Sequence, residues 1–235
     1  MKENGKRVLA AGIALLLAFA VWTALVRTVD VQTVPVRSLE ADRTEEGETD
    51  VGFASLNTQF HELTGEHEKI YSVTDWLGLV PIAVCGCFGI LGLVQLIRRR
   101  SLKKVDPDIL LLGAYYILVI LGYIAFEMIP VNCRPVIIAG AKEASYPSST
   151  TLLVLSVIPT LIFQANRRMA NAGLRNAVIV LAALFATFMT AGRTIAGVHW
   201  LTDIIGAVLL SAGLYLVYRA TVMIADGKKA EAGRE

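Results

Sequence analysis

The chain has 235 residues, of which 55% are hydrophobic, and its mean hydropathy is +0.59. One soluble core of this size would not bury so much apolar side chain, so the composition excludes an ordinary soluble domain and indicates a protein that lies in lipid. The formal net charge is only +2, from 22 basic and 20 acidic residues, so nothing in the charge balance indicates nucleic acid as a partner.

Six apolar segments are long enough, at roughly 20 residues, to cross about 30 Å of hydrocarbon as helices. They cover residues 8–26, 76–97, 109–129, 147–165, 177–191 and 201–224. The predicted fold class is therefore all-α, a bundle of six transmembrane helices. The fifth segment is the shortest, and we expect its end to open into a polar segment that holds Arg193 and His199.

The chain is expected to divide into four parts. Residues 1–26 form a cytoplasmic start and the first transmembrane helix, 27–75 an extracytoplasmic loop, 76–224 the transmembrane core and 225–235 a cytoplasmic tail. The first helix follows a basic stretch, as a signal peptide does. Its apolar stretch is longer than that of a typical signal peptide and no small-residue cleavage site follows it, so we expect a retained anchor.

Basic residues near the span ends predict the orientation in the membrane. Fifteen of the 22 lysines and arginines lie at the amino terminus, in the second and fourth connections and in the tail. This bias places both termini in the cytoplasm of a multi-pass plasma-membrane protein. The first, third and fifth connections then lie on the extracytoplasmic side.

The first connection contains an acidic stretch, for which we expect a solvated loop. Its members are Glu40, Asp42, Glu45, Glu46, Glu48 and Asp50. Apolar residues at helical spacing follow, from Phe53 to Leu63, and predict a short amphipathic helix that lies on the membrane surface or caps the bundle. His61 and His67 have no partner at metal-ligand spacing, so no metal site is predicted.

Three polar patches lie at span ends on the predicted extracytoplasmic face, although they are far apart in the sequence. They comprise Glu127 to Arg134-Pro135, then Tyr146-Pro147-Ser148-Ser149-Thr150, then Arg193, His199 and Asp203. Their convergence on one face indicates a functional site. The alternative is a buried polar network that only fixes the packing of the helices.

The third patch has the residue types that nucleophilic catalysis needs. His199 and Asp203 are four residues apart at the start of the last span, which puts them on one helix face. A carboxylate there can orient the imidazole and leave its other nitrogen free to attack. Arg193, across a turn with Gly197, and Arg134 carry planar guanidinium groups that suit a phosphate.

At these residues the sequence resembles the type 2 phosphatidic acid phosphatase superfamily, also called lipid phosphate phosphatases, which is related in fold to vanadium haloperoxidases. The family motifs are K-x6-R-P, P-S-G-H and S-R-x5-H-x3-D. Here they read Glu127-x6-Arg134-Pro135, Pro147-Ser148-Ser149-Thr150 and Gly192-Arg193-x5-His199-x3-Asp203. The resemblance covers roughly residues 76–218, and the third motif is the specific one.

The resemblance implies that His199 is a nucleophile that forms a phosphohistidine, with Asp203 as its orienting carboxylate. It implies phosphate binding by Arg193, Arg134 and the Pro-Ser-Ser-Thr turn with Ser148 and Ser149, and it implies no cofactor. The expected partners are a phosphorylated membrane lipid and the bilayer.

Two positions depart from the family pattern. The family's lysine is Glu127, which removes a positive charge, and its second histidine is Thr150, whose hydroxyl is too weak an acid to protonate a leaving group. One hypothesis is that a diphosphate, which has a less basic leaving group, is the better substrate. Another is that Lys142, Glu143 or Tyr146 supplies the proton. The alternative function is a weak or inactive protein that binds or transports lipid phosphates.

Overall fold

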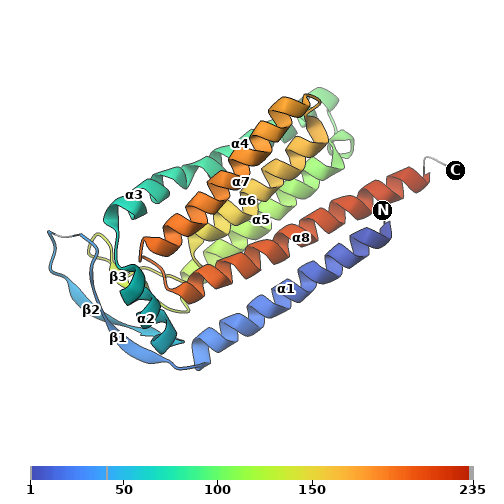
Figure 1. The fold of residues 1–235 in the computed structure, drawn as a ribbon. Helices are drawn as coiled ribbons and strands as arrows, with labels where there is room; N and C mark the ends of the chain where they lie inside the picture. Colours follow the sequence, from blue (N-terminus) through green and yellow to red (C-terminus); the bar gives the residue numbers. More distant parts are fainter. Residues whose placement is uncertain (1, 41, 233–235) are drawn as a thin grey trace.

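The structure is a computed structural model that describes residues 2–40 and 42–232 (Figure 1). Its helices and strands are, in chain order, α1 (Lys2–Thr28), β1 (Gln32–Ser38), β2 (Glu46–Val51), α2 (Ala54–Thr64), α3 (Glu68–Leu77), α4 (Leu79–Arg99), the short 3-10 helix η1 (Leu102–Lys104), α5 (Pro107–Met128), β3 (Val136–Ile137), α6 (Ser149–Arg168), α7 (Ala172–Ile195) and α8 (Leu201–Ala232).

The six-helix bundle predicted from hydropathy is confirmed. Within the described residues, six helical segments are long and apolar enough to cross a membrane, and α3 and α4 together form one of them. The sheet and α2 lie at one end of the bundle, here called the sheet end, and both chain termini lie at the other, here called the terminus end (Figure 1).

The first and last helices pack side by side along most of their length (Figure 1). Glycines permit this close approach: a Cβ atom on Gly12 would lie 3.0 Å from the backbone nitrogen of Val217, and one on Gly213 would lie 2.8 Å from a methyl carbon of Leu16. Small residues are the usual means by which helices in lipid come close. The α1–α8 pair therefore ties the beginning of the chain to its end.

Helix α7 is longer than predicted. The expected span ended at residue 191, with Arg193 in a polar segment beyond it, whereas α7 continues to Ile195 and carries Arg193 in its last turn. The reason is that α3 covers this polar end: a Cβ atom on Gly192 would lie only 2.7 Å from Cγ2 of Thr74. The neighbouring helix, and not an open loop, surrounds the arginine.

The acidic stretch is also not the solvated loop that we expected. Its second half is β2, which pairs antiparallel with β1 in a register that sets Val34 opposite Thr49 and Val36 opposite Gly47. Val34 and Val36 are buried, while Glu46 and Glu48 are exposed. Buried and exposed side chains alternate along a strand when one face of its sheet is covered. This alternation explains why a charged segment can form a strand.

The predicted amphipathic helix is present as α2, and it caps the bundle. The side-chain amide of Asn57 donates to the hydroxyl of Thr202 at 3.0 Å, and the indole of Trp22 donates to the Thr202 carbonyl at 3.1 Å. Helices α1 and α2 thus both hold the first turn of α8. That turn contains Asp203.

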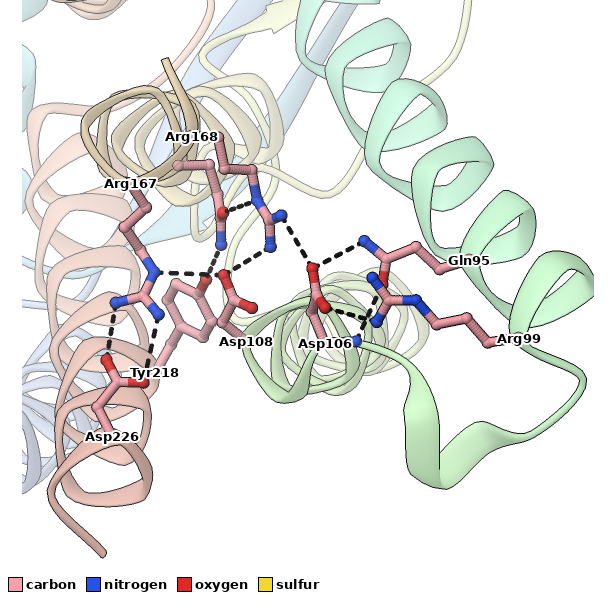
Figure 2. A network of polar contacts seen from close by, with 9 residues as sticks. Gln95, Arg99, Asp106, Asp108, Arg167, Arg168, Tyr218 and Asp226 are labelled. Atoms are coloured by element: carbon pink, nitrogen blue, oxygen red, sulfur yellow. Dashed lines mark hydrogen bonds and ion pairs between the residues drawn. The ribbon is translucent and has the colours of Figure 1, made fainter. Parts of the chain in front are cut away.

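At the terminus end a network of charged side chains joins α4, α5, α6 and α8 (Figure 2). The guanidinium group of Arg168 contacts Asp106 at 3.1 Å and Asp108 at 2.8 Å, and that of Arg167 contacts Asp226 at 2.7 Å. Arg99 reaches Asp106 from α4 at 2.7 Å. Four helices are therefore fastened at the end of the bundle far from the sheet.

Candidate active site

The third polar patch forms a tight turn between α7 and α8. Gly197 has a φ of +72°, which a residue without a side chain adopts at no steric cost, and a Cβ atom there would lie 2.1 Å from the carbonyl oxygen of Gly65. The backbone N–H of His67 donates to the Ala196 carbonyl at 3.0 Å. The connection between α2 and α3 therefore covers the turn, and His199 is only 3% exposed.

His199 and Asp203 are close, but another residue lies between them. Nδ1 of His199 and Oδ2 of Asp203 are 3.9 Å apart, too far for a hydrogen bond. The hydroxyl oxygen of Ser145 lies 3.1 Å from Nδ1 and 2.5 Å from Oδ2. The expected direct pair is therefore a bridged one, because His199 precedes the first turn of α8 and does not share its helical face.

The Ser145 bridge fixes the tautomer of the imidazole. A hydroxyl has one proton, and donating it to the Asp203 carboxylate leaves the Ser145 oxygen as an acceptor toward His199. Nδ1 must then carry the imidazole proton. Nε2, on the other side of the ring, then carries no proton, which is the form a nucleophile requires.

Asp203 is completely buried and its carboxylate is held from three directions. Besides Ser145, the backbone N–H of Trp200 donates to Oδ2 at 2.9 Å, and the side-chain amide of Asn132 donates to Oδ1 at 3.0 Å. These donors satisfy a buried charge that would otherwise be costly. The carboxylate is thereby fixed in position.

The electrostatic surroundings keep His199 neutral. Burial lowers the pKa of its imidazole well below the ordinary value, and the positive charges of Arg134 and Arg193 lower that pKa further. A hydrogen bond with the Ser145 main chain acts in the opposite sense but does not reverse the shift. A neutral imidazole beside two cations can attack an anion that those cations bind.

Two buried arginines lie near the imidazole. Nη2 of Arg193 lies 3.4 Å from Nε2 of His199, and Nη1 lies 3.4 Å from the Thr74 hydroxyl. Among the described residues, Nε of Arg193 and Nη1 of Arg134 are buried and have no hydrogen-bond partner. Unsatisfied guanidinium donors are expensive in a buried site, so these groups indicate a place for an oxyanion.

Two carboxylates balance part of this positive charge. Oε2 of Glu143 lies 3.1 Å from Nε of Arg134, and Oδ1 of Asp75 lies 3.7 Å from Nη1 of Arg193. The ring of Tyr71 lies under the Arg193 guanidinium at 5.0 Å. Asp75 and Tyr71 come from α3, so this short helix forms one wall of the site.

The second patch joins the site through the start of α6. The backbone N–H of Ser148 donates to the Asp203 carbonyl at 3.2 Å, which sets the first turn of α6 beside that of α8. The Ser148 hydroxyl is turned to Thr151 at 3.0 Å. Ser149 and Thr150 are half-buried at the helix start, where free backbone N–H groups suit an anion.

Two of the three residues considered as proton donors make contacts elsewhere, and Glu127, which replaces the family's lysine, makes none with the described residues. The Lys142 ammonium group donates to the Glu48 carbonyl at 2.7 Å and so anchors β2. The Tyr146 hydroxyl pairs with that of Thr23 in α1 at 2.7 Å. Glu127 is exposed, and within the described part of the chain no hydrogen bond or ion pair joins it to another residue.

Four residues that support the site were missed in the sequence: Ser145, Asn132, Thr74 and Asp75. None of the four stands at a position that defines a motif, and Thr74 and Asp75 lie in the first connection. Each meets its partner in the site only because the folded chain brings the two together. Ser145 directly precedes the Tyr-Pro-Ser-Ser-Thr patch and Asn132 lies within the patch that ends at Arg134, and these positions were the local signals available. No spacing in the sequence relates Thr74 or Asp75 to Arg193.

A cavity of about 540 Å³ opens next to the charged groups. Its walls come from α3, α4, α5 and α6 and are mostly apolar, with Asp75, Gly78, Leu79, Ile82, Cys85, Tyr116, Val119, Ile120, Tyr123, Ser149, Thr150, Leu152, Leu153 and Val157 as lining residues. Leu79, Ile82 and Ile120 are more than half exposed on the apolar outer surface of the bundle. The cavity therefore connects that surface with the site.

The fold is that of a multi-pass membrane protein. A family model described as the PAP2 superfamily matches residues 109–225, and the chain belongs to this superfamily. The match spans about half of the chain and contains all three polar patches. No curated protein matches the sequence.

A solved structure shares the fold over almost the whole chain. It is the crystal structure of the first transmembrane PAP2 type phosphatidylglycerolphosphate phosphatase from Bacillus subtilis, with a TM-score of 0.58 and 15% sequence identity. The similarity covers 90% of this chain and 96% of that one. At this identity the likeness concerns the fold alone.

Proposed function

We propose that the protein is a membrane phosphatase that hydrolyses a lipid phosphate or lipid diphosphate through a phosphohistidine on His199. The observation that carries this proposal is the buried neutral imidazole, whose free Nε2 lies 3.4 Å from an arginine with an unpartnered N–H. A protein that only binds phosphate needs the arginine. It does not need an imidazole held in one tautomer by a serine and a buried carboxylate.

In the proposed reaction, Nε2 of His199 attacks phosphorus while Arg193 and Arg134 bind the equatorial oxygens. Phosphoryl transfer depends mainly on positioning and on neutralising these oxygens, which guanidinium groups provide. The Asp203 carboxylate, acting through Ser145, stabilises the positive charge that develops on the ring. Water then attacks the phosphohistidine and releases phosphate.

A lipid substrate is supported by the cavity beside the site. Its apolar walls suit a hydrocarbon chain, and its polar end contains Asp75, Ser149 and Thr150. We also propose that the site faces the outside of the plasma membrane, with both termini in the cytoplasm. The support is the accumulation of basic residues at the terminus end, including those at the end of α4 and in η1, Arg98, Arg99 and Lys104.

The experiment that tests the function is phosphate release by the purified protein from a panel of lipid monophosphates and diphosphates. His199→Ala and His199→Asn should abolish turnover and should leave no acid-labile phosphoprotein after a rapid quench with labelled substrate. His67→Ala is the matched control, because His67 is exposed and its contact with Ala196 is made by the backbone. Normal turnover in folded His199→Ala protein would remove the covalent mechanism.

A second function, lipid-phosphate binding without hydrolysis, is favoured by Glu127 and Thr150 at positions where the family has a lysine and a histidine. The same panel decides between the two. Saturable binding without phosphate release by the wild-type protein supports the binding function. Release that depends on His199 supports the phosphatase.

A further inference from the structure

We propose that Asp75 is the general acid of this site and protonates the leaving oxygen of the lipid. This assignment rests on the proposed function. It answers a difficulty of that function, because Thr150 stands where the family has its acidic histidine and a hydroxyl cannot take over the role. Asp75 lies in α3, outside every motif of the sequence.

The position of Asp75 relative to the attacking nitrogen carries the argument. Its Oδ1 lies 3.7 Å from Nη1 of Arg193, and Nη2 of the same guanidinium group lies 3.4 Å from Nε2 of His199. The arginine thus lies between the acid and the nucleophile. A phosphoryl group bound to this guanidinium group would therefore lie near both the attacking nitrogen and the carboxyl group, and in-line displacement places the leaving oxygen opposite that nitrogen.

The cavity gives the second, independent observation. Among the described residues that line it, Asp75 is the only acidic one. Thr150 also lines this cavity. With the lipid tail in the cavity and the phosphate on the arginines, the oxygen that joins them lies at the mouth of the cavity. The Asp75 side chain is 58% exposed there, so it is free to reach that oxygen.

The other carboxylates near the site are less suitable. Glu143 is bound to Arg134 at 3.1 Å, and it does not line the cavity. Glu127 is likewise not a lining residue. Of these three acids, only Asp75 contacts both the group that binds phosphate and the space that receives the lipid.

The protons balance when the substrate is a phosphate monoanion, because this form carries the one proton that the leaving oxygen needs. In the first step the Nε2–P bond forms and the P–O bond to the lipid breaks, while the Asp75 carboxylate takes the proton of the phosphate and delivers it to the leaving oxygen. In the second step the oxygen of water bonds to phosphorus as the P–N bond breaks. The proton that this water loses goes to a phosphate oxygen, so Asp75 takes no part in the second step.

The test compares two leaving groups in Asp75→Asn protein. Phosphatidic acid in mixed micelles expels a basic alkoxide, whereas p-nitrophenyl phosphate expels a phenolate that needs no proton. We expect kcat for phosphatidic acid to fall about 100- to 10,000-fold, the range of general acid catalysis, and kcat for p-nitrophenyl phosphate to change little. Asp75→Glu should recover part of the lost activity, and Asp42→Asn on the exposed surface is the matched control.

The outcomes separate this assignment from the proposed function. An equal loss on both substrates would mean that Asp75 only positions Arg193. Unchanged rates on both substrates would mean that another group supplies the proton. Either result overturns the assignment alone. Absence of turnover in the wild-type protein with both substrates overturns the function and the assignment together. If Asp75→Asn does not fold, the ratio of the two rates in Asp75→Glu decides.

Discussion

Ser145 is the residue through which the carboxylate of Asp203 acts on His199. Its hydroxyl makes both contacts of the bridge, so the carboxylate and the imidazole depend on one side chain from a third segment. The arrangement differs from a simple histidine–aspartate pair in one respect. The tautomer of the imidazole depends on the direction in which the serine proton points.

We expect Ser145→Ala to lower kcat about 10- to 100-fold without unfolding the protein. Removing a hydrogen bond to a charged group costs about 1.5–3 kcal/mol, and each 1.36 kcal/mol corresponds to a factor of ten in rate. The measurement is phosphate release at saturating substrate. Ser101→Ala, at the opposite end of the bundle, is the matched control, and a Ser145→Ala rate within twofold of wild type would show that the bridge is dispensable.

At the residue scale, the sequence predicted the groups whose partners are near in the chain. Arg193, His199 and Asp203 lie within eleven positions, and helical spacing and one glycine turn are sufficient to group them. The bridge was not predictable in this way, because Ser145 is 54 positions from His199. The contact exists only because the start of α6 is bound to the start of α8.

At the scale of elements, hydropathy located the spans but not their ends. The length of α7 depended on α3, which covers Gly192 and Arg193 with its own polar residues. In the first connection, the charge of the acidic stretch obscured an alternation of buried and exposed residues that β1 and β2 share. Charge density alone was a poor guide there, because the exposed face of a strand can hold carboxylates in water while the other face is buried.

Asp106 offers a test of the network at the terminus end (Figure 2). Hydrogen bonds from Arg99, and then from Arg168 and Gln95, outweigh its burial and lower the pKa of Asp106 from 3.8 to about 2. A lowered pKa in the folded state contributes stability that is complete above the ordinary value of 3.8 and is lost as pH falls toward 2. The network should therefore weaken only in strong acid.

We expect Asp106→Asn to lower the unfolding temperature by about 2–4 °C at neutral pH, as a loss of about 1 kcal/mol does in a chain of this size. The difference from wild type should shrink as the pH is lowered from about 5 toward 2, because the wild-type carboxylate is then protonated too. Thermal unfolding in detergent, with Asp42→Asn as the exposed control, measures this. A difference that is constant with pH would contradict the ionic role.

At the scale of the whole molecule, the proposed orientation can be tested with single cysteines. In a background without Cys85, Cys87 and Cys133, Thr44→Cys lies exposed at the sheet end and Ala172→Cys lies exposed at the terminus end. An impermeant thiol reagent on intact cells should label the first and not the second, because the sheet end is expected outside. The reverse pattern would place the site in the cytoplasm and would contradict the proposed access to the outer leaflet.

The pairing of α1 with α8 has a consequence for biosynthesis. Chains grow from the amino terminus at roughly 5–20 residues per second, so α1 enters the membrane on the order of ten seconds or more before its partner is made. During this interval the glycine-lined face of α1 has only lipid or the insertion machinery to contact. The Asn57 amide and the Trp22 indole likewise cannot form their hydrogen bonds with Thr202 until that residue has been made. Helix α1 therefore reaches its final neighbours late, and the first turn of α8, which contains Asp203, is assembled only after most of the described residues have been made.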